Sequence, residues 1–133
     1  MITAVDTSVL LDVFGDDPKH AERSERFLAQ AFEQGSLVIC PVVYAELAPQ
    51  ARNRPQLDGW LHRGGIRVVA LTQEHGYTAG LAHAAYRKAG GKRERLLAEF
   101  LIGAHALHEA NRLLTRDRGF YRRYFAGLDI FGA

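Results

Sequence analysis

Short apolar runs that alternate with helix-forming segments constrain the fold of this chain more than any other feature of its sequence. Runs that are apolar on both faces are typical of buried parallel strands. Their alternation with helices predicts a parallel sheet covered by helices on both sides. The expected strands are Ile2–Val5, Leu37–Cys40, Ile66–Ala70, Arg112–Thr115 and Leu128–Phe131. We therefore predict an α/β fold, a three-layer α/β/α sandwich with a central parallel sheet of four to five strands.

The segments between these runs carry apolar residues at helical spacing or are bounded by helix breakers. Glycine and proline mark breaks at Gly15–Pro18, Gly64–Gly65 and Gly90–Gly91. The segment Glu94–Ala110 has the widest apolar face, so we expect it to form a largely buried helix. The other helices are expected at Val9–Phe14, Lys19–Glu33, Val42–Leu47, Gln56–His62, Gln73–Ala89 and Phe120–Phe125.

The bulk composition is that of a soluble globular protein. The chain has 133 residues, of which 47% are hydrophobic and 24% are charged, and this length fits one domain, residues 1–133. Cys40 is the single cysteine, so an internal disulfide is excluded, which suits a reducing compartment. The sequence shows no signal-peptide pattern and no apolar segment of membrane-spanning length. We therefore expect a cytoplasmic protein that does not contact a membrane.

Four acidic residues stand where parallel strands and their neighbouring helices would bring them together. Asp6 follows the first strand and Asp117 follows the fourth. Glu46 lies on the helix after the second strand, and Glu99 lies on the helix before the fourth. If the first, second and fourth strands are neighbours, all four carboxylates can reach one pocket at the carboxyl edge of the sheet, where open α/β folds bind ligands.

Each of these acids also has an ordinary structural explanation. Asp6 and Asp117 could cap the helices that follow them, and Glu46 and Glu99 could be surface charges on helices. Glu99 is the hardest to explain in this way, because it lies in the most apolar helix. Buried acids are rare unless they are paired or bind a metal ion.

A cluster of carboxylates points to a hard metal ion. The carboxylates repel one another, so one of them takes up a proton unless a cation is supplied. Oxygen ligands select ions such as Mg²⁺ or Mn²⁺, which can activate water and neutralise charge that grows on a phosphate. Ser8 and Thr115 carry hydroxyl groups next to these acids and could hold a carboxylate in place. Backbone hydrogen bonding at a strand end is the alternative for both, and for Ser8 it is the favoured one.

Basic residues gather in two places, although the formal net charge is only +2. One is the segment Tyr86–Arg95, and the other consists of Arg116, Arg118, Arg122 and Arg123. Such clusters are compatible with a nucleic-acid backbone and equally with a solvated surface. Arg116, Arg118 and Arg122 are the candidates for binding phosphates beside the acidic residues.

Taken in order, these motifs resemble those of the PIN domain, and among PIN domains those of the VapC-type toxins of bacterial toxin–antitoxin pairs. The matching segments are Ala4–Leu11, Val42–Leu47, Glu99–Ala106 and Leu113–Tyr121. The resemblance implies a small α/β fold and an Mg²⁺- or Mn²⁺-dependent endoribonuclease with RNA as its substrate. It also implies a homodimer and an antitoxin partner that blocks the acidic pocket.

The resemblance further implies that the four acids are the catalytic metal ligands. Asp6, Glu46 and Asp117 match the family's acids directly, whereas Glu99 stands where the family usually has aspartate. Glutamate is one methylene group longer, so it can still bind a metal ion, but the spacing or the metal preference would change.

Two other classes of function fit parts of the sequence. A catalytically weak or inactive PIN-like module could bind RNA or a protein without cutting, and Glu99 is its best support. A receiver-like signalling domain would also have an acidic pocket, but Arg116 stands where such a domain needs a lysine.

Four further residues have side chains that could take part in chemistry. His105 and His108 are spaced to share a zinc ion, yet no other His or Cys is placed to complete such a site. Asp12 is expected to cap a helix or to face solvent. Tyr121 is expected to pack the last helix or to stack on RNA bases.

Overall fold

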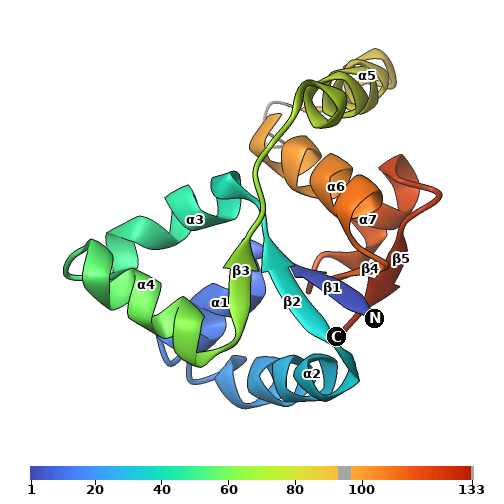
Figure 1. Ribbon diagram of the computed structural model, residues 1–133. Helices are drawn as coiled ribbons and strands as arrows, with labels where there is room; N and C mark the ends of the chain where they lie inside the picture. Colours follow the sequence, from blue (N-terminus) through green and yellow to red (C-terminus); the bar gives the residue numbers. More distant parts are fainter. Residues whose placement is uncertain (93–96, 133) are drawn as a thin grey trace.

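The computed structural model describes residues 1–92 and 97–132 and contains one parallel five-stranded sheet (Figure 1). Its strand order is β3-β2-β1-β4-β5, and all four neighbouring pairs are parallel. The strands are β1 (Ile2–Val5), β2 (Ser36–Ile39), β3 (Ile66–Val68), β4 (Arg112–Leu114) and β5 (Asp129–Phe131). The predicted α/β class and parallel sheet are therefore confirmed, with five strands.

Helices connect the strands and cover both faces of the sheet. Right-handed crossovers that run in opposite directions along a sheet lie on opposite faces, and Figure 1 shows α2 and α6 on opposite sides of the strands. None of the described helices is long and apolar enough to cross a membrane. The helices are α1 (Thr7–Phe14), α2 (Ala21–Gln34), α3 (Pro41–Leu47), the 3₁₀ turn Ala48–Gln50, α4 (Arg54–Arg63), α5 (Gln73–Lys88), α6 (Leu97–Glu109) and α7 (Arg118–Tyr124).

Some predicted boundaries differ from the observed ones. Helix α2 begins at Ala21 and not at Lys19, because the Asp17 carboxylate accepts hydrogen bonds from the backbone N–H groups of Lys19 and His20 and holds a turn before the helix. Strand β3 ends at Val68 and not at Ala70. The predicted start of the buried helix at Glu94 lies outside the described residues.

Strand β1 lies at the point where the chain changes direction across the sheet. From β1 the chain adds β2 and β3 on one side, and then β4 and β5 on the other. The backbone N–H of Asp6 donates to the carbonyl of Leu114 (2.9 Å), so the ends of β1 and β4 are tied together. Ligands bind at such a switch point in open α/β sheets, outside the carboxyl ends of the strands.

A cluster of aromatic rings packs α6 against α7 and the residue that follows it. Phe100 is fully buried, and its ring packs against those of Phe120, Tyr124 and Phe125 at centroid distances of 5.1, 6.0 and 6.3 Å. Gly103 lies directly against the Phe125 ring, where a Cβ atom would overlap the ring carbons. This close approach fixes the position of α6, the helix that carries Glu99.

The buried rings of His75 on α5 and His105 on α6 pack against each other, with a centroid distance of 4.9 Å. His105 is buried, and its Nε2–H donates to the carbonyl of Val69 (2.8 Å). Burial lowers the pKa of His105, and the nearby His75 acts in the same direction, while Glu109 opposes it. The Nδ1 atom of His75 on α5 accepts a hydrogen bond from the backbone N–H of Thr72 (2.9 Å), and its Nε2 lies 3.2 Å from the carboxylate of Glu109 on α6.

We therefore expect the free energy of unfolding to fall as the pH drops below about 6.5, the ordinary pKa of histidine. The unfolded chain takes up a proton that folded His105 resists, so this contribution is fully present only above that pH. Thermal unfolding at about pH 7.5 and about pH 5.5 should show a larger loss for the wild type than for His105→Gln, whose amide can still donate to Val69. Equal losses would contradict this assignment.

Candidate functional site

The four predicted acids line one pocket of about 500 Å³ at the carboxyl edge of the sheet. Asp6 comes from the end of β1, Glu46 from α3, Glu99 from the first turn of α6, and Asp117 from the residues after β4. The four acids come together because β1 lies between β2 and β4, which is the arrangement that the predicted pocket requires. The other lining residues are Thr7, Ser8, Leu11, Ile102, Arg116 and Tyr121.

Asp6 is the most buried of the four acids, with 7% of its surface exposed. Its Oδ1 accepts from the backbone N–H of Thr7 (2.8 Å) and its Oδ2 from the Thr115 hydroxyl (2.7 Å). Its pKa is raised to about 6, mainly by burial and to a smaller extent by the carboxylates of Glu46 and Asp117, while the hydrogen bonds from Thr115 and Thr7 oppose the rise. Asp6 therefore caps α1. Burial and the neighbouring carboxylates also make its ionised form unfavourable, and a bound cation would stabilise that form.

Thr115 connects two of the acids. Its hydroxyl donates to Asp6 and accepts from the backbone N–H of Asp117 (2.9 Å), and the residue is fully buried. The predicted contact between Thr115 and a carboxylate is therefore present in the structure. Asp117 itself makes no side-chain capping bond to the described helix α7, so its capping explanation loses support.

Glu46 is oriented by Thr7, which was not among the predicted site residues. The hydroxyl of Thr7 donates to Oε1 of Glu46 at 2.6 Å, which links the start of α1 to α3. Helix α3 is itself fixed by Pro41 in its first turn and by Cys40, whose sulfur accepts from the backbone N–H of Val42 (3.3 Å). Thr7 carries a hydroxyl group directly after Asp6 in the sequence, and this is the same signal that pointed to Ser8.

Two more of the predicted site residues, Ser8 and Glu99, line the same pocket. The hydroxyl of Ser8 is 3.5 Å from Oδ2 of Asp6, at the limit of a hydrogen bond, so it is a weaker support than Thr115. Glu99 is half-buried and not enclosed, although it lines the pocket beside Ile102. Its longer side chain reaches the same pocket as the three acids that match the family motif directly.

The predicted phosphate-binding arginines divide into two groups. Arg116 lines the acidic pocket, but its Nε and Nη2 also donate to the carboxylate of Asp12 at 2.8 and 3.1 Å. The expectation that Asp12 caps a helix or faces solvent is wrong, because Asp12 is 3% exposed and also accepts from the Ser24 hydroxyl at 2.6 Å. Arg118 and Arg122 are exposed on α7 and are not among the residues that line the acidic pocket.

Tyr121 closes the pocket from the side of α7. It is 1% exposed and packs against Phe120, which agrees with the packing role expected from the sequence. Burial holds the pKa of the Tyr121 phenol well above its usual range, and the carboxylate of Asp6 has the next largest effect. The phenol is therefore neutral and does not supply a nucleophile near neutral pH.

The donor set fits a hard divalent cation that keeps part of its water shell. Within residues 1–92 and 97–132, no three His, Cys, Asp or Glu side chains are close enough to form a ready-made metal cage. The four acids are spread over the walls of a roomy pocket, and Mg²⁺ commonly binds through one or two carboxylates and retains several waters. His105 and His108, which the sequence did not support as a zinc site, do not line the acidic pocket, and His108 is hydrogen-bonded to Thr78 (2.8 Å).

The structure is that of an α/β protein with an acidic pocket at the switch point of its parallel sheet. Comparison with known proteins identifies its family. The PIN domain family model matches residues 3–126, so the chain belongs to the PIN domain family. A search of curated protein sequences gave no match.

Solved structures with the same fold include several complexes. VapBC2 from Rickettsia felis bound to a promoter DNA fragment has a TM-score of 0.75 at 18% identity, with 98% of each chain covered. VapBC-1 from nontypeable Haemophilus influenzae has a TM-score of 0.73 at 21% identity, covering 99% of this chain and 98% of the other. A toxin–antitoxin complex from Klebsiella pneumoniae has a TM-score of 0.60 at 19% identity, covering 97% and 95%. At these identities the likeness concerns the fold, which confirms the predicted PIN-like architecture.

Proposed function

We propose that this protein is a metal-dependent endoribonuclease of the VapC toxin type, neutralised by a cognate antitoxin. The observation that carries the proposal is the meeting of Asp6, Glu46, Glu99 and Asp117 in one pocket at the switch point of a PIN fold. Membership of the PIN family and the likeness to VapBC and toxin–antitoxin complexes support it. A homodimer is part of the same proposal.

The four acids would hold Mg²⁺ or Mn²⁺. When bound, such an ion polarises the phosphate, helps to generate the attacking hydroxide from water, and stabilises the leaving oxygen. Thr115 and Thr7 orient Asp6 and Glu46 through hydrogen bonds of 2.7 and 2.6 Å, which limits the rearrangement needed for binding. The buried Tyr121 ring and Ile102 form the apolar part of the pocket, which strengthens charge interactions beside it.

The test is cleavage of RNA by the pure protein with Mn²⁺ or Mg²⁺, compared with the same reaction in a chelator. We expect Glu99→Gln to lower the cleavage rate by at least about 100-fold, because a carboxylate that binds the metal ion is lost. Even the loss of a group that only hydrogen-bonds to a metal ligand lowers activity by about 10–100-fold. Glu99→Asp restores the residue usual in the family and should cleave within about 10-fold of the wild type. Cleavage that persists in chelator, or full activity of Glu99→Gln, would refute the proposal.

A second candidate is a PIN-like module that binds RNA or protein without cutting. The glutamate at position 99 and the spread of the acids over the pocket walls favour it. If this candidate is correct, the wild type binds RNA and leaves it intact in Mn²⁺, and replacing the acids does not change RNA affinity.

A further inference from the structure

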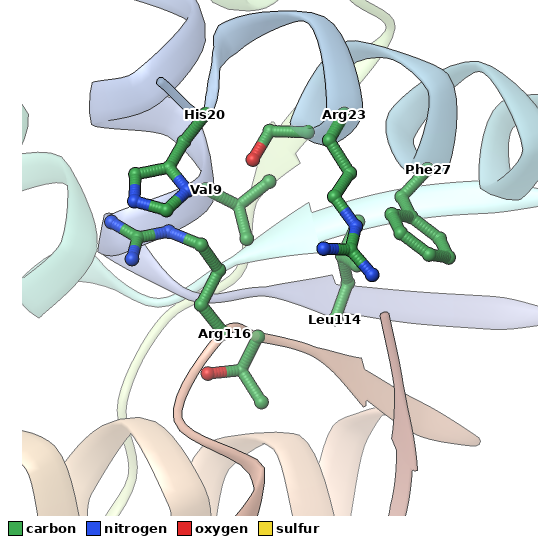
Figure 2. A pocket seen from close by; sticks show the side chains of 8 residues that line it. Val9, His20, Arg23, Phe27, Leu114 and Arg116 are labelled. Atoms are coloured by element: carbon green, nitrogen blue, oxygen red, sulfur yellow. The ribbon is translucent and has the colours of Figure 1, made fainter. Parts of the chain in front are cut away.

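A second cavity lies next to the acidic pocket and shares Arg116 with it. It measures about 190 Å³ and is formed between α2, α1 and the residues after β4. Figure 2 shows the side chains of His20, Arg23 and Arg116 around one space, with Phe27 beside Arg23. We call this cavity the basic pocket; its lining residues are Val9, His20, Arg23, Ser24, Phe27, Leu114, Thr115 and Arg116.

The lining combines positive charge with an apolar wall. Within the described part of the chain, no carboxylate lines the basic pocket and Arg23 has no ion-pair partner. Arg116 is held by the buried carboxylate of Asp12, which fixes its guanidinium at the cavity and leaves it partly exposed. Phe27 and Leu114 supply apolar surface next to these cations. Guanidinium groups beside an aromatic ring suit a nucleotide, because they bind the phosphate and the ring contacts the base.

Two residues lie between the basic pocket and the acidic pocket. Arg116 lines both cavities. Thr115 lines the basic pocket, and its hydroxyl donates to Asp6 in the acidic pocket. A strand of RNA whose scissile phosphate lies among the acids would therefore pass Arg116 and reach the basic pocket with a neighbouring nucleotide. The volume of the basic pocket is below the roughly 300–1,000 Å³ of sites for drug-sized ligands. The pocket is therefore suited to a small group, such as one phosphate and the adjoining base.

We infer that the basic pocket binds one nucleotide of the RNA next to the scissile phosphate. The phosphate contacts Arg23 and Arg116, and the base packs against Phe27 and Leu114. The inference rests on the proposed ribonuclease function, and it adds a subsite built from α2, a helix that carries none of the four acids. It assigns RNA and not an acidic peptide, because Arg116 lines both pockets and Thr115 of the basic pocket is hydrogen-bonded to Asp6 of the acidic pocket.

The test compares two arginines of α2 in a binding assay without divalent metal, so that catalysis plays no part. Arg23 lines the basic pocket, whereas Arg26 is exposed and pairs with Glu22 (3.9 Å) on the same helix. The probe is a short fluorescein-labelled single-stranded RNA of mixed sequence, titrated by anisotropy at several salt concentrations. Arg23→Gln should weaken binding about 5- to 10-fold and reduce the slope of log Kd against log salt by about 0.7. Arg26→Gln should change neither quantity measurably.

The apolar wall is tested in the same assay. Phe27→Leu keeps apolar volume but removes the ring, and we expect RNA binding to weaken at least about 5-fold. Phe32→Leu is the matched control, since Phe32 is 58% exposed on the same helix and does not line the basic pocket. Thermal unfolding of each variant shows whether its fold is intact.

The outcomes separate this inference from the proposed function. If Arg23→Gln binds RNA as tightly as the wild type, with the same salt slope, the basic pocket is not an RNA subsite, although cleavage by the wild type would still support the nuclease. If the wild type does not bind the RNA, the inference is likewise overturned. If binding depends on Arg23 but no RNA is cut in Mn²⁺, the subsite stands and the nuclease proposal fails.

Discussion

Replacing Asp6 by asparagine is expected to abolish RNA cleavage and, at the same time, to stabilise the metal-free protein. The carboxylate is buried, and its pKa is raised from 3.8 to about 6, so at neutral pH the fold holds a charge that it disfavours. The shift corresponds to about 3 kcal/mol, of which asparagine should recover a part because it also loses good acceptor contacts. Cleavage should fall by at least about 100-fold, since a central ligand is gone.

The pH dependence of this stabilisation has a defined sign. The folded-state pKa of Asp6 lies above its unfolded value, so the penalty is absent below about pH 4 and grows as the pH rises toward about 6. In chelator, thermal unfolding should therefore show Asp6→Asn above the wild type by roughly 4–8 °C at neutral pH, and the two should converge near pH 4. Asp16→Asn, at an exposed residue, is the control for charge alone. A less stable Asp6→Asn at neutral pH would contradict the electrostatic account of this site.

The second large effect is expected at Asp12. This buried carboxylate accepts from Ser24 and from two nitrogens of Arg116, and its removal leaves a buried gap and an arginine without its partner. Breaking a buried ion pair costs about 3–5 kcal/mol. Because Arg116 keeps 35% of its side-chain surface exposed, we expect Asp12→Ala to cost about 2–3 kcal/mol, or roughly 10 °C in melting temperature.

Denaturant unfolding measures this loss, and Ser24→Ala provides the scale for a single neutral hydrogen bond, about 1 kcal/mol. Asp12→Ala should also weaken RNA binding, because Arg116 is no longer held between the acidic and basic pockets. An Asp12→Ala protein as stable as Ser24→Ala would show that the Arg116 pair contributes little.

The strands and the acids were predictable because both follow from local pattern. Buried parallel strands are short apolar runs, and residues that follow them within a few positions, such as Asp6 and Asp117, lie at one edge of the sheet. The position of β1 between β2 and β4 was assumed in the prediction and is observed in the structure. Glu46 and Glu99 reach the pocket from helices, and their placement required this strand order.

The missed features are side-chain contacts between distant segments. Thr7 orients Glu46 across 39 positions of the sequence, and Arg116 pairs with Asp12 across 104. Propensity and periodicity describe what happens within an element, so they do not report which polar groups meet when elements pack. The basic pocket was missed for the same reason, since Arg23 and Arg116 form separate local patterns and meet only in the folded chain.

The most direct test of the central claim is a crystal of the wild-type protein soaked in Mn²⁺, with the ion located by its anomalous scattering. The account predicts a peak in the acidic pocket at about 2 Å from a carboxylate oxygen of Asp6 and from at least one further acid among Glu46, Glu99 and Asp117. An acidic pocket that remains without a peak in saturating Mn²⁺, or an ion bound only outside it, would contradict the account.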